Sequence, residues 1–594
     1  MRTFLSVTAV IAAVAVTGAA WLVFLASGST LKPLVEWTGG MATGEAVAIG
    51  ALSIDRGRVT RVSASDVSIG SEGAASRIDA LEFDVDMSSL FGEQPIFEKA
   101  ALRGAEFTIS SSGGGAGGDV SLPVVREFSL SDVTIVRSAP VEGDETESFE
   151  VRIDEASGDL LAGEASRLSG TGVFREEAFE FSVTAGDASA YAAGGETPIE
   201  ISVDGALTAD ASTTVRADGS TSAIDFSVEG PTLAVLRPFV ITPLPDTPPF
   251  SLSGAVSIEA DGYDLRGIEG AVGDSDVAGD VKVSFSGPTP EVSGALRSSR
   301  VFFADVVGLL GYSADGSAGG GGFFPDTPIP EERLRALRLD LEFVADDVEV
   351  PFADIAGVDA KIVLADDRLA IKPLAIGVAG GEAKGAVAVN LRQATPSADV
   401  DLAFSGVAFD GLLPDNQLAS RAGGTISGDV YLLGVGSSLA EILGSARGGG
   451  RILLADGEAP ALVIEGLGLD VAEAIGVAVS GGTPVSVPCA GVAFTAADGT
   501  ADIDAAEALT EESVIRLAGS VGLRSLEYRL TAEARAKDFS ILDFDAPIEL
   551  EGRGADYSLS IGDAGEVSLF AESEGGSATC ERLAERLRKE DASR

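Results

Sequence analysis

The stretch LEFDVDM at residues 81–87 decides the fold class, because its odd-numbered positions are apolar and its even-numbered positions are acidic. Successive side chains of a β-strand point to opposite faces, so this strand has one oily face and one anionic face. The same alternation returns in FEFSV (179–183), IEISVDG (199–205), IDFSVEG (224–230), VKVSFSG (281–287), LDLEF (339–343) and VDLAFSG (400–406). The chain is therefore predicted to be mainly β, with a large amount of one-sided apolar surface.

The composition fits a folded and strongly acidic protein. The 594 residues include 92 Asp or Glu against 41 Lys or Arg, a formal net charge of −51, and 45% of them are hydrophobic. A nucleic-acid-binding protein needs basic patches that displace counterions from phosphates, and none is visible, so we exclude nucleic acid as a partner. The acidity indicates a solvated, self-repelling surface, which adaptation to high salt would also produce.

The chain contains no histidine, which removes the usual general base near neutral pH and the commonest metal ligand. GGGAGG (113–118) matches a nucleotide-binding glycine pattern by composition alone, because no helical pattern follows it. GDSDVAG (273–279) begins like a calcium loop, but Ala278 and Phe285 stand at two ligand positions. The sequence therefore predicts a protein that is not an enzyme and holds neither a metal ion nor a cofactor.

Two cysteines, Cys489 and Cys580, are too few for a disulfide framework or for a zinc site made of cysteines alone. In an oxidising compartment they permit one bridge, which would close a long loop. Two unrelated buried thiols are the alternative.

An uncharged segment, FLSVTAVIAAVAVTGAAWLVFL (4–25), is long enough to cross a membrane, because its residues at about 1.5 Å each reach ~33 Å. A cleavable signal peptide usually has a shorter apolar region. We therefore predict an uncleaved transmembrane helix, with a removed signal peptide as the alternative. Arg2 favours a cytoplasmic N-terminus, although Lys32 weakens this bias. The bulk of the chain is then exported, which in a bacterium with two membranes means the periplasm.

The predicted organisation follows from this segment and from the strand pattern. It comprises a cytoplasmic tip (1–3), a transmembrane anchor (4–25), an N-terminal β-groove region (27–290), a second β region (291–575) and a C-terminal amphipathic helix or tail (576–594). A few short helices are expected at 302–310, 331–339, 438–446 and 462–476, where apolar residues recur at three- to four-residue spacing.

The second half resembles the AsmA family of membrane-anchored bacterial envelope proteins. The resemblance rests on an ordered series of phrases: ALRSSRVFFADVVGLLG (295–311), FFPDTPIPEERLRALRLDLEFVADDVEV (323–350), DDRLAIKPLAIGVAGGEAKGAVAV (366–389), SSLAEILGSARGGGRILLADGE (437–458) and PVSVPCAGVAFTAADG (484–499). It covers about residues 290–590, and more loosely the anchor and GRVTRVSASDVSIGS (57–71), whereas 110–290 fits only in the style of its strands. The chain is shorter than the largest members of the family and more acidic.

The resemblance implies an inner-membrane anchor and a periplasmic body related to bridge-like lipid-transfer proteins. It implies a long, curved antiparallel β-sheet that forms an elongated apolar groove, associated with phospholipid movement between the inner and outer membranes and with outer-membrane homeostasis. The ligand would be phospholipid acyl chains, and any outer-membrane protein partner stays unknown.

The apolar face of amphipathic strands must be buried against something, and helices are too scarce in this sequence to bury it. If the sheet stays open, acyl chains cover a groove lining that includes Phe83, Val85, Phe179, Phe181, Ile201, Val203, Leu341 and Phe343. Closed sandwiches with filled cores are the alternative. The protein would then be a non-transporting periplasmic scaffold or assembly factor for outer-membrane proteins, and the same residues would be ordinary core.

Overall fold

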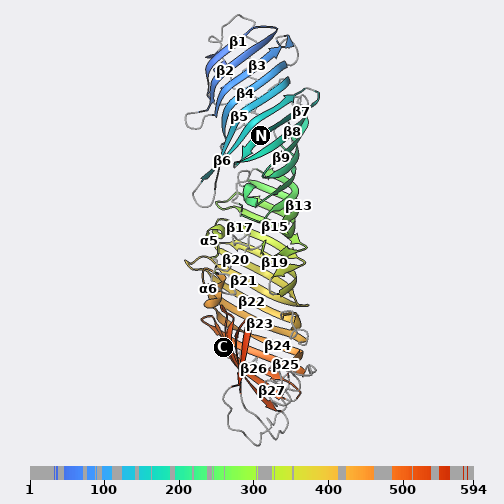
Figure 1. Ribbon diagram of the computed structural model, residues 1–594, viewed down its shortest axis with the longest axis vertical. Helices are drawn as coiled ribbons and strands as arrows, with labels where there is room; N and C mark the ends of the chain where they lie inside the picture. Colours follow the sequence, from blue (N-terminus) through green and yellow to red (C-terminus); the bar gives the residue numbers. More distant parts are fainter. Residues whose placement is uncertain are drawn as a thin grey trace. The chain divides into compact units, whose positions relative to one another are not determined.

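The computed structural model of the chain is built almost entirely from β-strands, and within each unit most strands lie beside the next in sequence (Figure 1). The structure describes residues 46–70, 76–86, 88–89, 96–109, 124–140, 146–161, 163–174, 176–187, 194–216, 220–236, 246–259, 261–302, 328–350, 353–412, 423–459, 485–511, 513–536, 547–554 and 556–561, with single positions at 32, 33, 35–37, 40, 244, 304, 305, 324, 326, 580, 583 and 585. These residues form 30 strands and few helices, so the prediction of a mainly β fold is confirmed.

The chain divides into an N-terminal unit (Met1–Gly273) and a C-terminal unit (Asp274–Arg594). The strands of the N-terminal unit are β1 (Val47–Asp55), β2 (Val59–Ile69), β3 (Ser76–Asp86), β4 (Ile96–Ile109), β5 (Val124–Pro140), β6 (Thr146–Leu160), β7 (Ala165–Phe174), β8 (Glu177–Asp187), β9 (Glu196–Asp204), β10 (Thr208–Arg216), β11 (Ile224–Gly230), β12 (Phe250–Glu259) and β13 (Gly262–Val272). Each pairs antiparallel with the next, except that β4 and β5 are parallel. A short 3-10 helix, η2 (Leu233–Leu236), follows β11.

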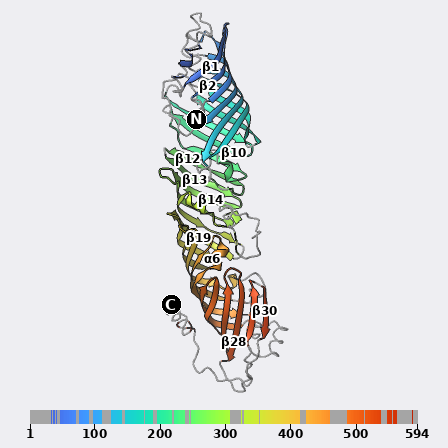
Figure 2. The same ribbon diagram turned by 90° about the vertical axis from the view of Figure 1, so that its left-hand side faces the viewer.

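The strands of the C-terminal unit are β14 (Ser275–Ser284), β15 (Glu291–Ser298), β16 (Val301–Phe302), β17 (Arg338–Ala345), β18 (Val348–Val350), β19 (Ala353–Ala365), β20 (Arg368–Val378), β21 (Gly381–Asn390), β22 (Ser397–Ala408), β23 (Gly423–Val435), β24 (Arg447–Ala459), β25 (Val485–Ala497), β26 (Thr500–Leu509), β27 (Ser513–Gly522), β28 (Glu527–Ala536), β29 (Ile548–Arg553) and β30 (Asp556–Ile561). The described pairings are antiparallel, apart from parallel β15–β17 and β16–β18. Figure 2 shows β28 and β30 near the end of this unit. β14 and β15 fall within the C-terminal unit, where β15 pairs with β14 and β17.

The alternating sequence pattern becomes an alternating burial pattern. In β3 the apolar side chains of Leu81, Phe83 and Val85 are buried, while the acidic residues between them stay partly exposed. Burial of apolar area drives this arrangement, at about 25 cal/mol for each Å2 removed from water. The residue that ends the predicted strand, Met87, lies outside the described residues.

A buried hydrophobic core lies on one face of the first strands of the N-terminal unit. It comprises Val35, Val47, Ile49, Ala64, Val67, Ile69, Ile78, Leu81, Phe83, Val85, Phe97, Ala100, Leu102, Ala105, Phe107, Val125, Leu130, Val133 and Ala156. The rings of Phe83 and Phe97 meet edge to face with centroids 5.9 Å apart, a favoured geometry for aromatic pairs. This part of the sheet is therefore packed as an ordinary protein interior.

The segment before β1 fastens onto that strand. The backbone N–H of Ile49 donates a hydrogen bond to Glu36 Oε1 at 2.8 Å, and Lys32 Nζ donates to the carbonyl oxygen of Gly50 at 3.2 Å. Val35 is 1% exposed within the core. A free sheet edge presents unpaired backbone groups, and these two bonds satisfy two of them on β1.

Helices are short among the described residues. Within the expected helix 331–339 the structure has α5 (Glu331–Arg335), and within 438–446 it has α6 (Leu439–Gly444), whose N-cap Ser438 accepts a hydrogen bond from the Glu441 N–H. A 3-10 turn, η3 (Asp410–Leu412), follows β22. None of the helices that the structure describes is long and apolar enough to cross a membrane. The predicted anchor (4–25) and the expected helix 462–476 lie outside the described residues.

Candidate functional site

Two rows of apolar residues cross the sheet of the N-terminal unit. Strand register aligns Leu168, Val183, Ile201, Ala211, Phe226 and Gly254 in one row, from β7 to β12, and Gly170, Phe181, Val203, Ala209, Val228, Leu252 and Gly270 in the other, from β7 to β13. Every member is half-buried or exposed, and none carries a charge or a polar side-chain atom. Ile201 is 41% exposed. We call the side of the sheet that carries these rows its apolar face.

The opposite side of the same strands is polar. Its side chains alternate with the two rows and include Ser169, Thr171, Glu180, Ser182, Ser202, Asp204, Asp210, Asp225 and Ser227, all exposed. Two hollows of about 460 and 470 Å3 lie over β7–β11, and their linings combine these polar residues with row residues, namely Gly170, Phe181 and Val203 in one and Ile201, Ala211 and Phe226 in the other. Neither lining includes Lys or Arg.

The C-terminal unit repeats the two rows. One aligns Leu341, Ile362, Ile371, Val387, Val400, Leu432 and Gly448, and the other aligns Phe343, Ala360, Leu374, Gly385, Leu402, Val430, Gly450 and Phe494. Most members are half-buried, with Ala360 and Leu374 buried. These rows define the apolar face of the C-terminal unit, and they too contain no charged residue.

Five of the eight residues predicted for the groove lining lie in these rows. Phe181, Ile201 and Val203 belong to the N-terminal unit, and Leu341 and Phe343 stand at the β17 end of the rows in the C-terminal unit. The structure thus brings them together in two groups, one in each unit.

Phe179 lies next to these rows and pairs in register with Gly172. Its ring centroid is 6.1 Å from that of Phe181. A Cβ at position 172 would stand 2.6 Å from Cζ of Phe179, so the glycine leaves room for the ring to lie across the neighbouring strand. Phe179 therefore extends the apolar surface beyond the row that contains Phe181.

Phe83 and Val85 need a correction, since neither is accessible as a groove lining. Each is only 1% exposed, and both pack in the core that contains Val35 and Phe97. Their strand has the same alternation as β8, but neighbouring side chains cover it. Among the eight predicted residues these two are core, and the other six are half-buried or exposed, with Phe181 packed against that core.

The apolar faces can hold an apolar ligand but cannot orient it through hydrogen bonds. A ligand that covers an additional 50 Å2 of apolar surface gains about 1.2 kcal/mol from leaving water. Because the rows continue from strand to strand without a polar interruption, the gain changes little as a hydrophobic chain shifts along them. Such a surface suits a long aliphatic ligand that moves.

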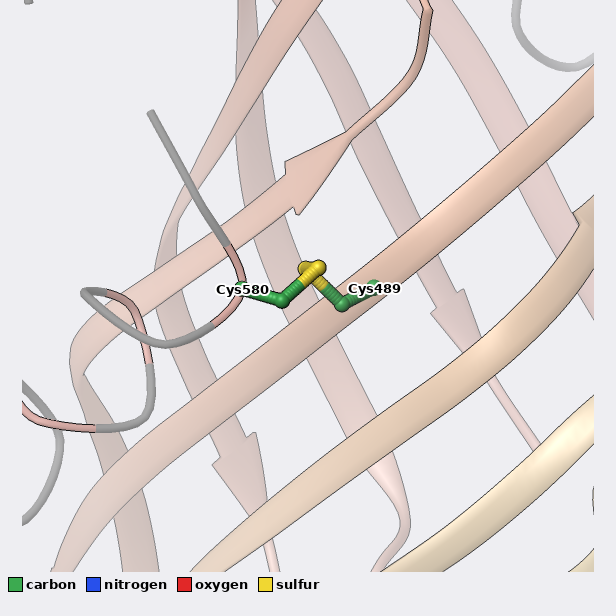
Figure 3. The surroundings of a disulfide bond; sticks show 2 residues. All are labelled: Cys489 and Cys580. Atoms are coloured by element: carbon green, nitrogen blue, oxygen red, sulfur yellow. A yellow bond between two sulfur atoms is a disulfide. The ribbon is translucent and has the colours of Figure 1, made fainter. Parts of the chain in front are cut away.

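The two cysteines form a disulfide that joins β25 to the C-terminal segment (Figure 3). Cys489 is 6% exposed, and Cys580 lies on the surface. Leu583, from the predicted tail 576–594, is 3% exposed in a small core with Cys489, Ala493, Leu509 and Val514. On β25 these core positions alternate with Val492 and Phe494, so Cys580 and Leu583 attach on the side opposite the apolar face.

The phrase that resembles a calcium loop has a structural role. Asp276 Oδ1 accepts hydrogen bonds from the Ser298 hydroxyl at 2.9 Å and the Arg300 N–H at 2.7 Å, and Oδ2 accepts one from the Ser299 N–H at 2.9 Å. Burial opposes its ionisation, but these bonds outweigh that effect and hold the pKa of Asp276 well below its usual range. The described residues contain no group of three or more carboxylates or cysteines that could hold a metal ion.

Replacing Asp276 by asparagine is expected to destabilise the C-terminal unit by about 2 kcal/mol at pH 7, because the amide turns an N–H group toward backbone N–H donors. The unfolded carboxyl group, with its pKa near 3.8, binds a proton more readily than the folded one. The ionised Asp276 carboxylate therefore contributes its full share to the free energy of unfolding above about pH 5. Its contribution declines as the pH falls toward 2. Urea denaturation at several pH values measures it.

The matched control for this prediction is Asp401→Asn, at an exposed position of β22. It should change the free energy of unfolding by less than about 0.5 kcal/mol. An Asp276 variant that is as stable as this control at neutral pH would contradict the proposed capping role.

Sequence reasoning missed the small members of the rows and the contacts of the segment before β1. Ala209, Ala211 and the row glycines carry no hydrophobic pattern of their own, and only the register places them beside larger residues. In the sequence, Glu36 cannot be told from a solvent-exposed acidic residue, and only the structure shows that its carboxylate accepts a hydrogen bond from β1. No local signal could have identified either group.

The comparisons with known proteins find a family model and a curated relative. The model of the AsmA family matches residues 197–508. The AsmA family protein YhjG of Escherichia coli (strain K12) is 26% identical over 334 residues, which are 52% of this chain and 48% of that protein. The chain thus spans about half the length of the curated relative it matches. No solved structure matches the chain.

Proposed function

The chain belongs to the AsmA family, and from that premise we propose that it is a cell-envelope protein that carries phospholipid along the apolar faces of its sheets. The lipid would pass between the inner and outer membranes and so support outer-membrane homeostasis. In this proposal the uncharged segment 4–25 anchors the chain in the inner membrane, and the two units lie in the periplasm.

The observation that carries the proposal is the pair of uninterrupted apolar rows in each unit. A soluble protein rarely leaves a large contiguous apolar surface without a partner, so exposed rows mark a binding surface. Their composition selects the ligand class: aliphatic and aromatic side chains bury acyl chains well and give a phosphate nothing to bind. The lipid headgroup would then remain in water beside the sheet.

The polar faces support the same proposal. Hydroxyls and carboxylates line the polar face of the N-terminal unit, and in both units cations pair with carboxylates across strands, as in Arg61 with Asp84 at 2.7 Å and Lys361 with Asp340 at 2.9 Å. The hydrogen bond from Arg61 lowers the pKa of the Asp84 carboxyl group. Such a face stays hydrated and repels other copies of the chain. Lipid would therefore be confined to one side of each sheet.

Replacing Val203 by glutamate is expected to slow phospholipid transfer between vesicles by more than about tenfold, because a charge in the row must lose its water whenever an acyl chain passes. Native mass spectrometry of the full-length chain in mild detergent should also show fewer bound phospholipids than in the unaltered protein. The row position tolerates the change structurally because it is only half-buried.

The control is Ser169→Glu, which adds the same charge to the polar face, two residues from the exposed Arg167. This variant should retain bound lipid and transfer. Equal loss in the two variants would contradict a role for the apolar row. An unaltered chain that carries no lipid and transfers none would refute lipid transport and favour the scaffold alternative, which crosslinking to a protein partner would then test.

A further inference from the structure

Trp37 is 60% exposed, although the segment that carries it is fastened to the N-terminal unit. A tryptophan side chain is large and on average highly buried, so this exposure is unusual. The neighbouring Val35 lies in the core at 1% exposure. The indole therefore projects from a part of the chain that cannot turn away freely.

The attachment is specific to the free edge of β1. Glu36, directly before Trp37, accepts the Ile49 N–H at 2.8 Å, and Lys32 donates to the Gly50 carbonyl oxygen at 3.2 Å. Lys32 Nζ also lies 3.9 Å from Glu36 Oε1. These contacts tie the position of Trp37 to that of the first strand.

The sequence before this attachment places a membrane close by. The uncharged span ends at Leu25, and seven peptide steps to Lys32 reach at most about 25 Å when fully extended. The interfacial layer of a bilayer, roughly 5–7 Å thick on each side, is where tryptophan rings concentrate, with the apolar part toward the acyl chains and the N–H toward water. Trp37 has this chemistry and lies within reach.

We propose that Trp37 inserts into the headgroup layer of the membrane that holds the segment 4–25, so that the β1 end of the N-terminal unit rests on the bilayer. This inference depends on the membrane anchoring in the proposed function and adds a second, residue-specific contact. The partner is the lipid surface itself. A fixed contact at β1 would hold the first sheet at one distance from its source of lipid.

Intrinsic fluorescence tests the proposal, because the chain has two tryptophans, Trp21 and Trp37. Trp21→Phe leaves Trp37 as the single reporter in the full-length chain. The variant is reconstituted into phosphatidylcholine vesicles whose acyl chains carry bromine either close to the headgroup or close to the methyl end. Bromine close to the headgroup should quench Trp37 at least about twofold more strongly than bromine close to the methyl end.

The matched control moves the reporter to the polar face of the same unit, as Trp21→Phe with Trp37→Phe and Ser227→Trp. Position 227 is exposed on β11, and its reporter should be quenched by neither vesicle. Vesicle flotation distinguishes failure of the Trp37 contact from failure of the membrane anchor. If the protein floats with the vesicles but Trp37 is unquenched, or is quenched mainly from the methyl end, the inference is wrong and the anchor stands. If the protein does not float, both are wrong.

Discussion

Replacing Cys489 and Cys580 together by alanine is expected to lower the free energy of unfolding of the C-terminal unit by roughly 4–5 kcal/mol. The disulfide closes a loop with a sequence separation of 91, so its loss returns a large conformational freedom to the unfolded chain. Urea denaturation of the purified oxidised chain, followed through the C-terminal unit, measures the change. The expected result is a clear fall in the midpoint.

Reduction separates this effect from side effects of the substitutions. A thiol reductant should shift the unaltered protein to the midpoint of the double variant and leave the double variant unchanged. Leu583→Ala keeps the disulfide but removes the buried side chain beside it, and should cost about 2–3 kcal/mol of local stability. Equal midpoints for the oxidised protein and the double variant would show that the bridge does not constrain the unit.

Replacing Phe97 by alanine should destabilise the N-terminal unit by about 3–5 kcal/mol, because the ring is 0% exposed and its removal leaves a cavity beside Phe83. The same change at Phe226, which is half-buried in an apolar row, should cost only about 1 kcal/mol. Hydrogen exchange of the strand amides in the full-length chain compares the two variants.

This contrast tests whether the rows are accessible to a ligand. A row residue in a sealed interior would behave like Phe97, since solvent could not fill the space that its ring leaves. Similar losses at Phe97 and Phe226 would therefore show that the rows are closed core, and would remove the basis for lipid binding on the apolar face.

The strands could be predicted from the sequence because alternation is a local property. LEFDVDM and FEFSV both give strands with one apolar side, and both are observed. Their burial could not be predicted, because it depends on what other parts of the chain cover. Phe83 is nearly inaccessible and Phe181 is half-buried, although the two stretches look alike. Pattern identifies a face, and only tertiary contacts decide whether it stays open.

The alignment of residues into apolar rows could not be predicted from the sequence, because it depends on the register in which the strands pair. Between Ile371 and Leu374 the pairing of β20 with β21 shifts, and this irregularity keeps both leucine-sized side chains in line with their neighbours. A sequence pattern that assumes strict alternation loses its phase there. The partnership of the two cysteines was likewise undecided, since spacing alone does not determine whether distant thiols meet.

Pairing of each strand with a neighbour close in sequence has a consequence for biogenesis. In each unit a newly made strand finds its template in the strand just completed, so assembly can follow the direction of synthesis with few long-range searches. The cysteine bridge is the exception, since Cys580 arrives long after Cys489. Its oxidation can therefore serve as the final step of maturation, and a chain truncated before residue 580 would fold most of its strands yet never be locked.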